Sequence, residues 1–171
     1  MTFRQPFWSR YLPTGFVVGV ATLGPLGQRL PAPGTWGSLA GLLLFAVFLR
    51  DAGAGAILAV SAIAAYLAVG FCGEAELRLK EKDPGKVVLD EVVVMPLCFL
   101  GWQALPALAP PWVALLAGFA LFRLFDILKP FGIARLQHLP GGWGVVADDC
   151  AAALAAAASL HTGYWLWARF G

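Results

Sequence analysis

One stretch of the chain, from Ala52 to Gly73, contains no charged residue. As a helix, roughly 20 apolar residues are long enough to cross the ~30 Å hydrocarbon core of a bilayer. A helix is stable there because its backbone hydrogen bonds are all internal. The stretch therefore predicts a membrane-spanning helix, and the rest of the chain has to fold around it.

The composition of the whole chain agrees with a membrane protein. Of its 171 residues, 60% are hydrophobic and 13% are charged, with a mean hydropathy of +0.76, whereas soluble domains carry about 25% charged residues. The formal net charge of +2 is small and indicates no nucleic-acid partner. We expect a single domain spanning residues 1–171.

Four further apolar runs accompany the first one, and several are short or contain proline. Together they predict an all-α, polytopic membrane helix bundle of about five apolar helices, some of them short or re-entrant. Before Thr35, the prolines and glycines of residues 24–34 exclude a helix, and Thr35 or Ser38 is expected to cap the helix that follows. The four runs are Trp36–Leu49, Val92–Leu108, the run from Pro111 to the helix containing Arg123, and Cys150–Trp167.

The charged residues are sorted by side if the five helices alternate in direction. With residues 1–35 in the cytoplasm, 10 of the 12 Lys and Arg residues lie on the cytoplasmic side, as the positive-inside rule predicts. On the same side lie 9 of the 10 Asp and Glu residues, which that rule does not predict. A small transporter or channel is the alternative function, but it predicts acidic residues through the depth of the membrane and on both sides.

The segment from Phe122 to Cys150 carries the densest pattern of charge. Arg123, Asp126 and Lys129 recur at every third residue and so share one face of a predicted helix, which Pro130 ends. Arg offers a bidentate fork to a phosphate group, and Lys offers a point charge. The segment predicts a site for a phosphate ester, although a charged helix end between two membrane helices is the simpler alternative.

Two pairs of adjacent acids, Asp90-Glu91 and Asp148-Asp149, each stand just before an apolar run. Either pair alone is explained by the favourable position of negative charge at a helix N-terminus. Two pairs together with Asp126 favour a cluster instead, and oxygen ligands of this kind select hard cations, Mg²⁺ above all. The glycine-rich turn before Thr35 could add backbone N–H groups for phosphate.

Three weaker signals are also present. Cys72 and Arg78 have the spacing of cysteine phosphatases, but two glutamates between them would repel phosphate, so we discount that reading. His138 is not expected to transfer protons. Asp83 precedes a proline and is expected to lie in a solvated turn, with membership of the metal site as the alternative.

Three blocks of the chain, the third of them in two parts, resemble the phosphatidylglycerophosphatase A family of bacterial membrane phosphatases. They occur in the family's order and, with the spans between them, cover most of the chain. The blocks are PAPGTWGSLAGL (Pro31–Leu42), KVVLDEVV (Lys86–Val93), and FRLFDILKPFGI (Phe122–Ile133) followed by GGWGVVADDCAA (Gly141–Ala152).

The resemblance implies Mg²⁺-dependent hydrolysis of phosphatidylglycerophosphate, a phospholipid, to phosphatidylglycerol and phosphate at the cytoplasmic face of the inner membrane. The chain departs from the family pattern at Val94, Gly132 and Ala153, which concern packing rather than charge. The family's polar positions imply four catalytic residues, which are Asp90, Glu91, Asp126 and Asp149. The implied metal ligands are the same four residues and Asp148. The implied phosphate-binding residues are Arg123, Lys129, Thr35 and Ser38, with Gly34 in the same glycine-rich block as the last two.

Overall fold

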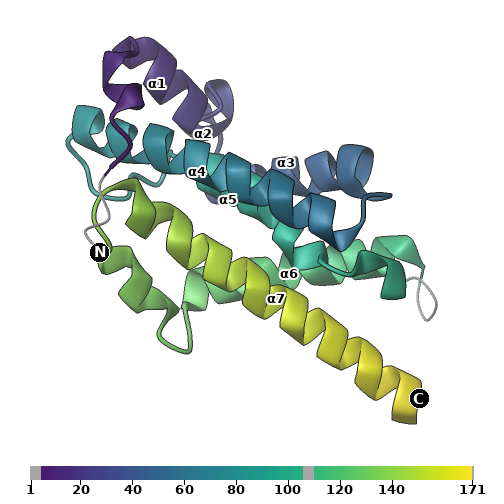
Figure 1. The fold of residues 1–171 in the computed structure, drawn as a ribbon. Helices are drawn as coiled ribbons and strands as arrows, with labels where there is room; N and C mark the ends of the chain where they lie inside the picture. Colours follow the sequence, from purple (N-terminus) through teal and green to yellow (C-terminus); the bar gives the residue numbers. More distant parts are fainter. Residues whose placement is uncertain (1–4, 106–109, 171) are drawn as a thin grey trace.

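The computed structural model describes residues 5–105 and 110–170, and this part of the chain is helical with no β-strand. Figure 1 shows the arrangement of the helices. In chain order they are η1 (Trp8–Tyr11), α1 (Thr14–Ala21), α2 (Pro25–Arg29), α3 (Pro33–Leu44), the π-helical turn η2 (Phe45–Leu49), α4 (Ala54–Leu79), α5 (Leu89–Val94), the 3-10 helices η3 (Met95–Phe99) and η4 (Trp102–Ala104), α6 (Pro111–Leu128), the 3-10 helix η5 (Ile133–His138) and α7 (Gly142–Phe170).

Three helices, α4, α6 and α7, are long and apolar enough to cross a membrane, with 26, 18 and 29 residues. The continuous helix of α3 and η2 is apolar but shorter. This confirms the predicted all-α membrane bundle with short members. The run predicted over Val92–Leu108 is broken into α5, η3 and η4, and its residues 106–108 lie outside the described part of the chain.

The broken segment from α5 to η4 forms the centre of the core. Phe99 is fully buried and stacks on Phe45 of η2 with ring centroids 4.3 Å apart, and Trp102 packs edge-on against both rings. The long helix α7 packs against α4, α5 and α6. The central segment is thus enclosed by the longer helices, and α5 is held where α6 and α7 can reach it.

The expectation that no helix forms before Thr35 was wrong. Pro25 and Pro33 each stand in the first turn of a helix, where the missing N–H has no intrahelical partner to lose. The N-cap of α3 is Ala32, so neither Thr35 nor Ser38 caps it. Instead, the Ser38 hydroxyl donates to the Gly34 carbonyl within the helix at 2.8 Å.

Two helices are also longer than the apolar pattern predicted. The charged sequence after Gly73, which lies beyond the predicted span, continues α4 to Leu79, stabilised by an i,i+4 ion pair between Arg78 and Glu74 at 2.9 Å. The last helix begins at Gly142, so Asp148 and Asp149 lie in its second turn rather than before it. Membrane helices can therefore extend into charged sequence beyond their apolar cores.

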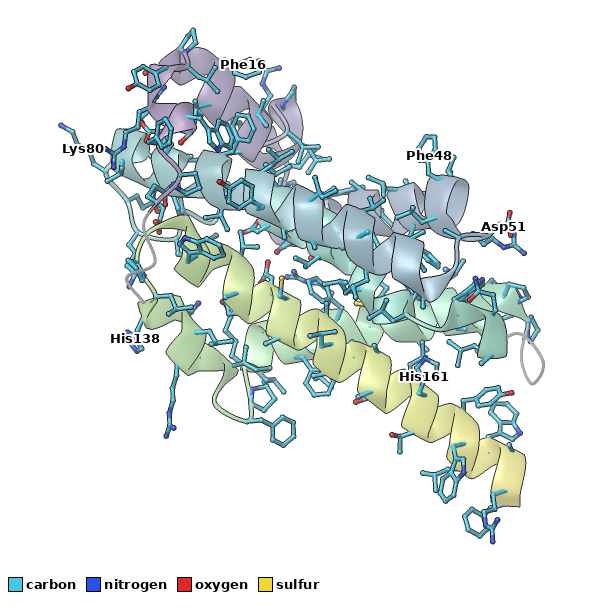
Figure 2. All side chains as sticks on the ribbon, in the orientation of Figure 1. Phe16, Phe48, Asp51, Lys80, His138 and His161 are labelled. Carbon is cyan, nitrogen blue, oxygen red and sulfur yellow. The ribbon has the colours of Figure 1, made fainter. Side chains whose placement is uncertain are left out.

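The ends of the bundle differ in character. Lys80 and His138 lie at one end, and Asp51 and Phe48 at the other (Figure 2). His161 of α7 forms a hydrogen bond with the Leu100 carbonyl at 2.6 Å and is not among the residues that line the pocket with the acids of α5. The acidic residues of α5, α6 and α7 line one pocket, which adjoins the pocket lined by His138 in the half of the bundle nearer Lys80 (Figure 2).

Candidate functional site

A pocket of about 160 Å³ lies where α5, the end of α6 and the second turn of α7 meet. We call it the carboxylate pocket, because six acidic side chains line it. Three of its acids, Asp90, Asp148 and Asp149, are at most 6% exposed. Its lining consists of Asp83, Pro84, Gly85, Val87, Asp90, Glu91, Asp126, Lys129, Val145, Asp148 and Asp149.

Arg123 joins the acids of α5 and α6. One nitrogen of its guanidinium donates to Glu91 Oε1 at 2.9 Å and to Asp126 Oδ2 at 2.8 Å. The three side chains are 12–18% exposed, so these ion pairs are only partly screened by solvent. Glu91 and Asp126, 35 positions apart in the sequence, therefore lie within reach of one common ligand.

The start of α3 closes the site from the side of Glu91. Ser38 accepts a hydrogen bond from Arg123 at 3.3 Å and lies 3.4 Å from Glu91 Oε2. Glycine is required on this helix face, since a Cβ at Gly37 would lie 2.6 Å from Glu91 Oε2 and 2.9 Å from the Val88 Cβ. The glycine-rich sequence of α3 thus serves close packing on α5, which the sequence pattern did not reveal.

Lys129 joins the acids of α6 and α7. We predicted that Lys129 belongs to the helix, but it is the first residue after α6 and has a left-handed backbone (φ 43°). Its ammonium bonds Asp148 Oδ2 and lies 3.8 Å from Asp126 Oδ1. The other oxygen of Asp148, Oδ1, is buried and has no hydrogen-bond partner among the described residues, so it is available to a water molecule or an ion.

The electrostatics of the pocket follow from burial and crowding. Burial, opposed by the nearby Arg123 charge, raises the pKa of Glu91 from 4.5 to about 7. Burial and the neighbouring Glu91 charge raise the pKa of Asp90 well above its usual value. For Lys129, burial lowers the pKa, but the hydrogen bond and charge of Asp148 outweigh it and leave the pKa raised. The nearby cations therefore do not fully offset the effect of burial and crowding on Asp90 and Glu91.

The donor set fits a hard divalent cation. Among the described residues, no three Asp, Glu, His or Cys side chains converge closely enough to hold a metal ion as they stand. Arg123 and Lys129 hold three of the carboxylates instead. Mg²⁺ usually takes only one or two carboxylates, keeps several waters and binds substrate phosphates. A lining with six carboxylates, one of whose oxygens, Asp148 Oδ1, has no partner among the described residues, suits that mode of binding.

Most of the predicted site residues come together. Asp90, Glu91, Asp126, Lys129, Asp148 and Asp149 line the carboxylate pocket, and Arg123 and Ser38 bond to its members. Thr35 is exposed in the first turn of α3 and is not among the lining residues. Asp83, which we expected in a solvated turn, is exposed but lines the pocket. Cys72 is fully buried within α4, in agreement with our rejection of a cysteine phosphatase.

Comparisons with known proteins agree with the resemblance seen in the sequence. The family described as Phosphatidylglycerophosphatase A matches residues 19–164. A "Phosphatidylglycerophosphatase A" of Haemophilus influenzae is 39% identical over 80% of this chain and 82% of its own length. One of Escherichia coli K12 is 32% identical over 56% of this chain and 53% of its own.

A third relative has a different name. A "Putative phosphatidylinositol-3-phosphatase" of Bacteroides thetaiotaomicron is 36% identical over 50% of this chain and 52% of its own length. No solved structure matches the chain.

Proposed function

The chain belongs to the phosphatidylglycerophosphatase A family, and we propose that it hydrolyses the terminal phosphate of phosphatidylglycerophosphate to give phosphatidylglycerol and phosphate. We further propose that it does so with Mg²⁺, at the cytoplasmic face of the bacterial inner membrane. The observation that carries the proposal is the carboxylate pocket, where acids and cations from α5, α6 and α7 meet.

Arg123 and Lys129 are proposed to bind the phosphate group. Each cation bonds carboxylates, and a phosphate group offers negatively charged oxygens of the same kind, with a larger negative charge than one carboxylate. The planar guanidinium can give two parallel hydrogen bonds to phosphate, and the ammonium can follow the group as a point charge. Substrate would then replace some of these acids as partners of the two cations.

Once phosphate replaces the carboxylates as the partner of Arg123 and Lys129, those carboxylates can bind a cation. Asp148 and Asp149 from α7, Asp126 from α6, and Asp90 and Glu91 from α5 form the proposed Mg²⁺ set. When bound, Mg²⁺ would neutralise charge on the phosphate oxygens and favour deprotonation of water. The unpartnered Asp148 Oδ1 supports this assignment from within the chain.

The hydrolysis needs one further group, a base. A carboxylate of the pocket that does not hold the ion would take a proton from the attacking water. The water oxygen forms a bond to phosphorus, and the bond from phosphorus to the lipid oxygen breaks. The lipid oxygen takes up a proton and becomes the free hydroxyl of phosphatidylglycerol.

Membrane geometry supports a site on one side. Six acidic side chains line one pocket, which adjoins the pocket lined by His138, whereas Asp51 lies at the opposite end of the bundle from Lys80 and His138 (Figure 2). A transporter or channel would place ionisable groups through the membrane depth. The positive-inside bias predicted from the sequence supports the cytoplasmic side for the acidic half.

A panel of lipids tests the proposal. Purified protein in detergent would be given phosphatidylglycerophosphate, phosphatidic acid or phosphatidylinositol 3-phosphate, each with Mg²⁺ or with chelator. We expect phosphate release from phosphatidylglycerophosphate with Mg²⁺ and none with chelator. Preference for the inositol lipid, which the name of the Bacteroides relative makes the second candidate, would reassign the substrate, and chelator-resistant release would refute the role of Mg²⁺.

A further inference from the structure

A second pocket, of about 280 Å³, adjoins the carboxylate pocket near His138, toward the end of the bundle marked by Lys80 (Figure 2). Glu76 of α4 and Gln137 of η5 also line it. The two pockets share the residues Asp83 and Val145. Asp83, on the segment between α4 and α5, therefore stands at the boundary between them.

Two contacts hold Asp83 in place. Its backbone N–H donates to Glu76 Oε1 at 2.7 Å, and its Oδ2 accepts a longer bond from Gln137 Nε2 at 3.3 Å. Its backbone is left-handed, with φ of 47°. A non-glycine residue keeps such a conformation only where its surroundings fix it, and such residues gather at functional sites. The 2.7 Å hydrogen bond to Glu76 fixes the backbone of Asp83, whereas its carboxylate is held only by the longer bond from Gln137.

The carboxylate pocket beside Asp83 contains a buried carboxylate oxygen without a partner in the part of the chain that the structure describes. Asp148 is 2% exposed, and its Oδ1 has no hydrogen-bond partner among the described residues. Lys129 donates its hydrogen bond to the other oxygen of that side chain, Oδ2. A buried carboxylate oxygen without a partner is costly, so a ligand at this position would stabilise the pocket.

We propose that Asp83 is a sixth carboxylate of the ion site, which binds the ion either directly or through one of its waters. The inference rests on the proposed Mg²⁺-dependent function. When the ion binds, the Asp83 carboxylate exchanges Gln137 for the ion, while Glu76 keeps its backbone in position. The segment between α4 and α5 then closes the carboxylate pocket on the side of the second pocket.

Binding of Mn²⁺ to the full chain in detergent tests this without any measurement of activity. Mn²⁺ takes the same oxygen ligands as Mg²⁺. The electron paramagnetic resonance signal of free Mn²⁺ decreases as the ion binds, so it reports how much is bound. Asp83→Asn removes the charge, whereas asparagine still tolerates the positive φ and can still accept from Gln137. We expect the Kd for Mn²⁺ to rise at least about tenfold, as when a group that supports a metal site is lost.

Two control variants separate this role from a structural one. Glu81→Gln removes a neighbouring acid that lies 4.0 Å from Lys86 and lines the pocket around Leu77 and Lys80, but neither the carboxylate pocket nor the pocket beside His138, so Mn²⁺ binding should stay unchanged. Gln137→Ala breaks the bond to Asp83 but leaves its charge, so Mn²⁺ should bind equally well or more tightly.

Two results would overturn the role of Asp83 but not the proposed function. One is a wild-type affinity for Mn²⁺ in Asp83→Asn. The other is a loss of Mn²⁺ affinity in Gln137→Ala that equals the loss in Asp83→Asn. If the wild-type chain bound no Mn²⁺ and no Mg²⁺, the Mg²⁺-dependent function itself would be refuted and the role of Asp83 with it. A thermal unfolding midpoint near that of the wild type would show that each variant is folded.

Discussion

The two pairs of adjacent acids look alike in the sequence but occupy different settings in the fold. Asp90 and Glu91 lie in the first turn of the short helix α5, where the helix dipole favours negative charge. Asp148 and Asp149 lie in the second turn of α7, where that effect has faded, and they are 2% and 4% exposed. The second pair therefore has fewer structural reasons to be acidic.

The partners of the two pairs differ in the same sense. Glu91 bonds both Arg123 and Ser38. In contrast, Asp148 has Lys129 on one oxygen and no partner on the other among the described residues. The comparison teaches that similar acidic pairs need not have equal roles, and that among the described residues the pair on α7 has fewer partners for its charge.

The largest effect should come from the pair on α7. We expect Asp149→Asn to lower kcat for phosphate release at least about a hundredfold, the lower end of what a positioned catalytic group contributes. The shape is kept, but the charge that would hold the ion is lost. Asp51→Asn, at the opposite end of the bundle, is the matched control and should keep full activity. Full activity in Asp149→Asn would remove the α7 pair from the site.

The next largest effect concerns the cation that serves the α5 pair. Arg123→Lys keeps the charge but loses the planar fork to phosphate, so we expect kcat/KM to fall about tenfold or more, by the loss of a charge-assisted hydrogen bond. Steady-state kinetics on the phosphorylated lipid would measure this. Arg50→Lys, outside the site, should change nothing. Equal kinetics for Arg123→Lys and the wild type would show that Arg123 only balances Glu91 and Asp126.

Packing around the α5 pair gives a smaller effect. In Gly37→Ala the added methyl would meet Glu91 Oε2 and the Val88 side chain, and overpacking of this kind costs about 1–3 kcal/mol. We expect a lower unfolding midpoint and a partial loss of activity. Gly163→Ala on α7 is the control, because a Cβ there has nothing within 4 Å. If both variants were equally stable, α3 would not constrain Glu91.

The pair on α7 can be probed through Lys129. Lys129→Met leaves Asp148 buried without its cation, so we expect a lower unfolding midpoint in metal-free detergent. Asp148→Asn in the same chain should recover part of the loss, because the uncompensated charge is gone. Additive effects of the two changes in this double-mutant cycle would show that the two side chains are not coupled.

The smallest effect is a pH dependence from the α5 pair. In the metal-free protein, burial raises the pKa of Glu91 to about 7, so protons compete with a cation below that pH. The Kd for Mg²⁺, measured by calorimetry, should therefore be lower at pH 8 than at pH 6. An affinity that is constant across this range would mean that Glu91 is not among the groups that hold the ion.

The sequence predicted the helical membrane bundle and the members of the charged cluster, because long apolar runs and clustered ionisable residues are each strongly constrained by a bilayer. It did not predict helix ends. The run after Gly141 looks like a turn, yet it forms the first turn of α7, because Gly142 packs so closely on α4 that a Cβ there would lie 2.0 Å from the Val69 carbonyl.

Tertiary contacts explain the other differences. Ser38 was expected at a helix start, but its position beside Arg123 and Glu91 follows from the packing of α3 on α5. Asp83 was expected in a solvated turn, since an Asp-Pro dipeptide indicates no more than that. Its place at the pocket depends on Glu76 and Gln137, which lie 7 and 54 positions away. No local pattern encodes such contacts.

The central claim is that both acidic pairs serve one ion-dependent phosphatase site. It is tested most directly by the Mg²⁺ concentration that gives half-maximal phosphate release from phosphatidylglycerophosphate, measured for the wild type, Glu91→Gln and Asp149→Asn. We predict that either change raises this concentration at least about tenfold or abolishes release. Wild-type activity with an unchanged Mg²⁺ requirement in either variant would contradict the claim.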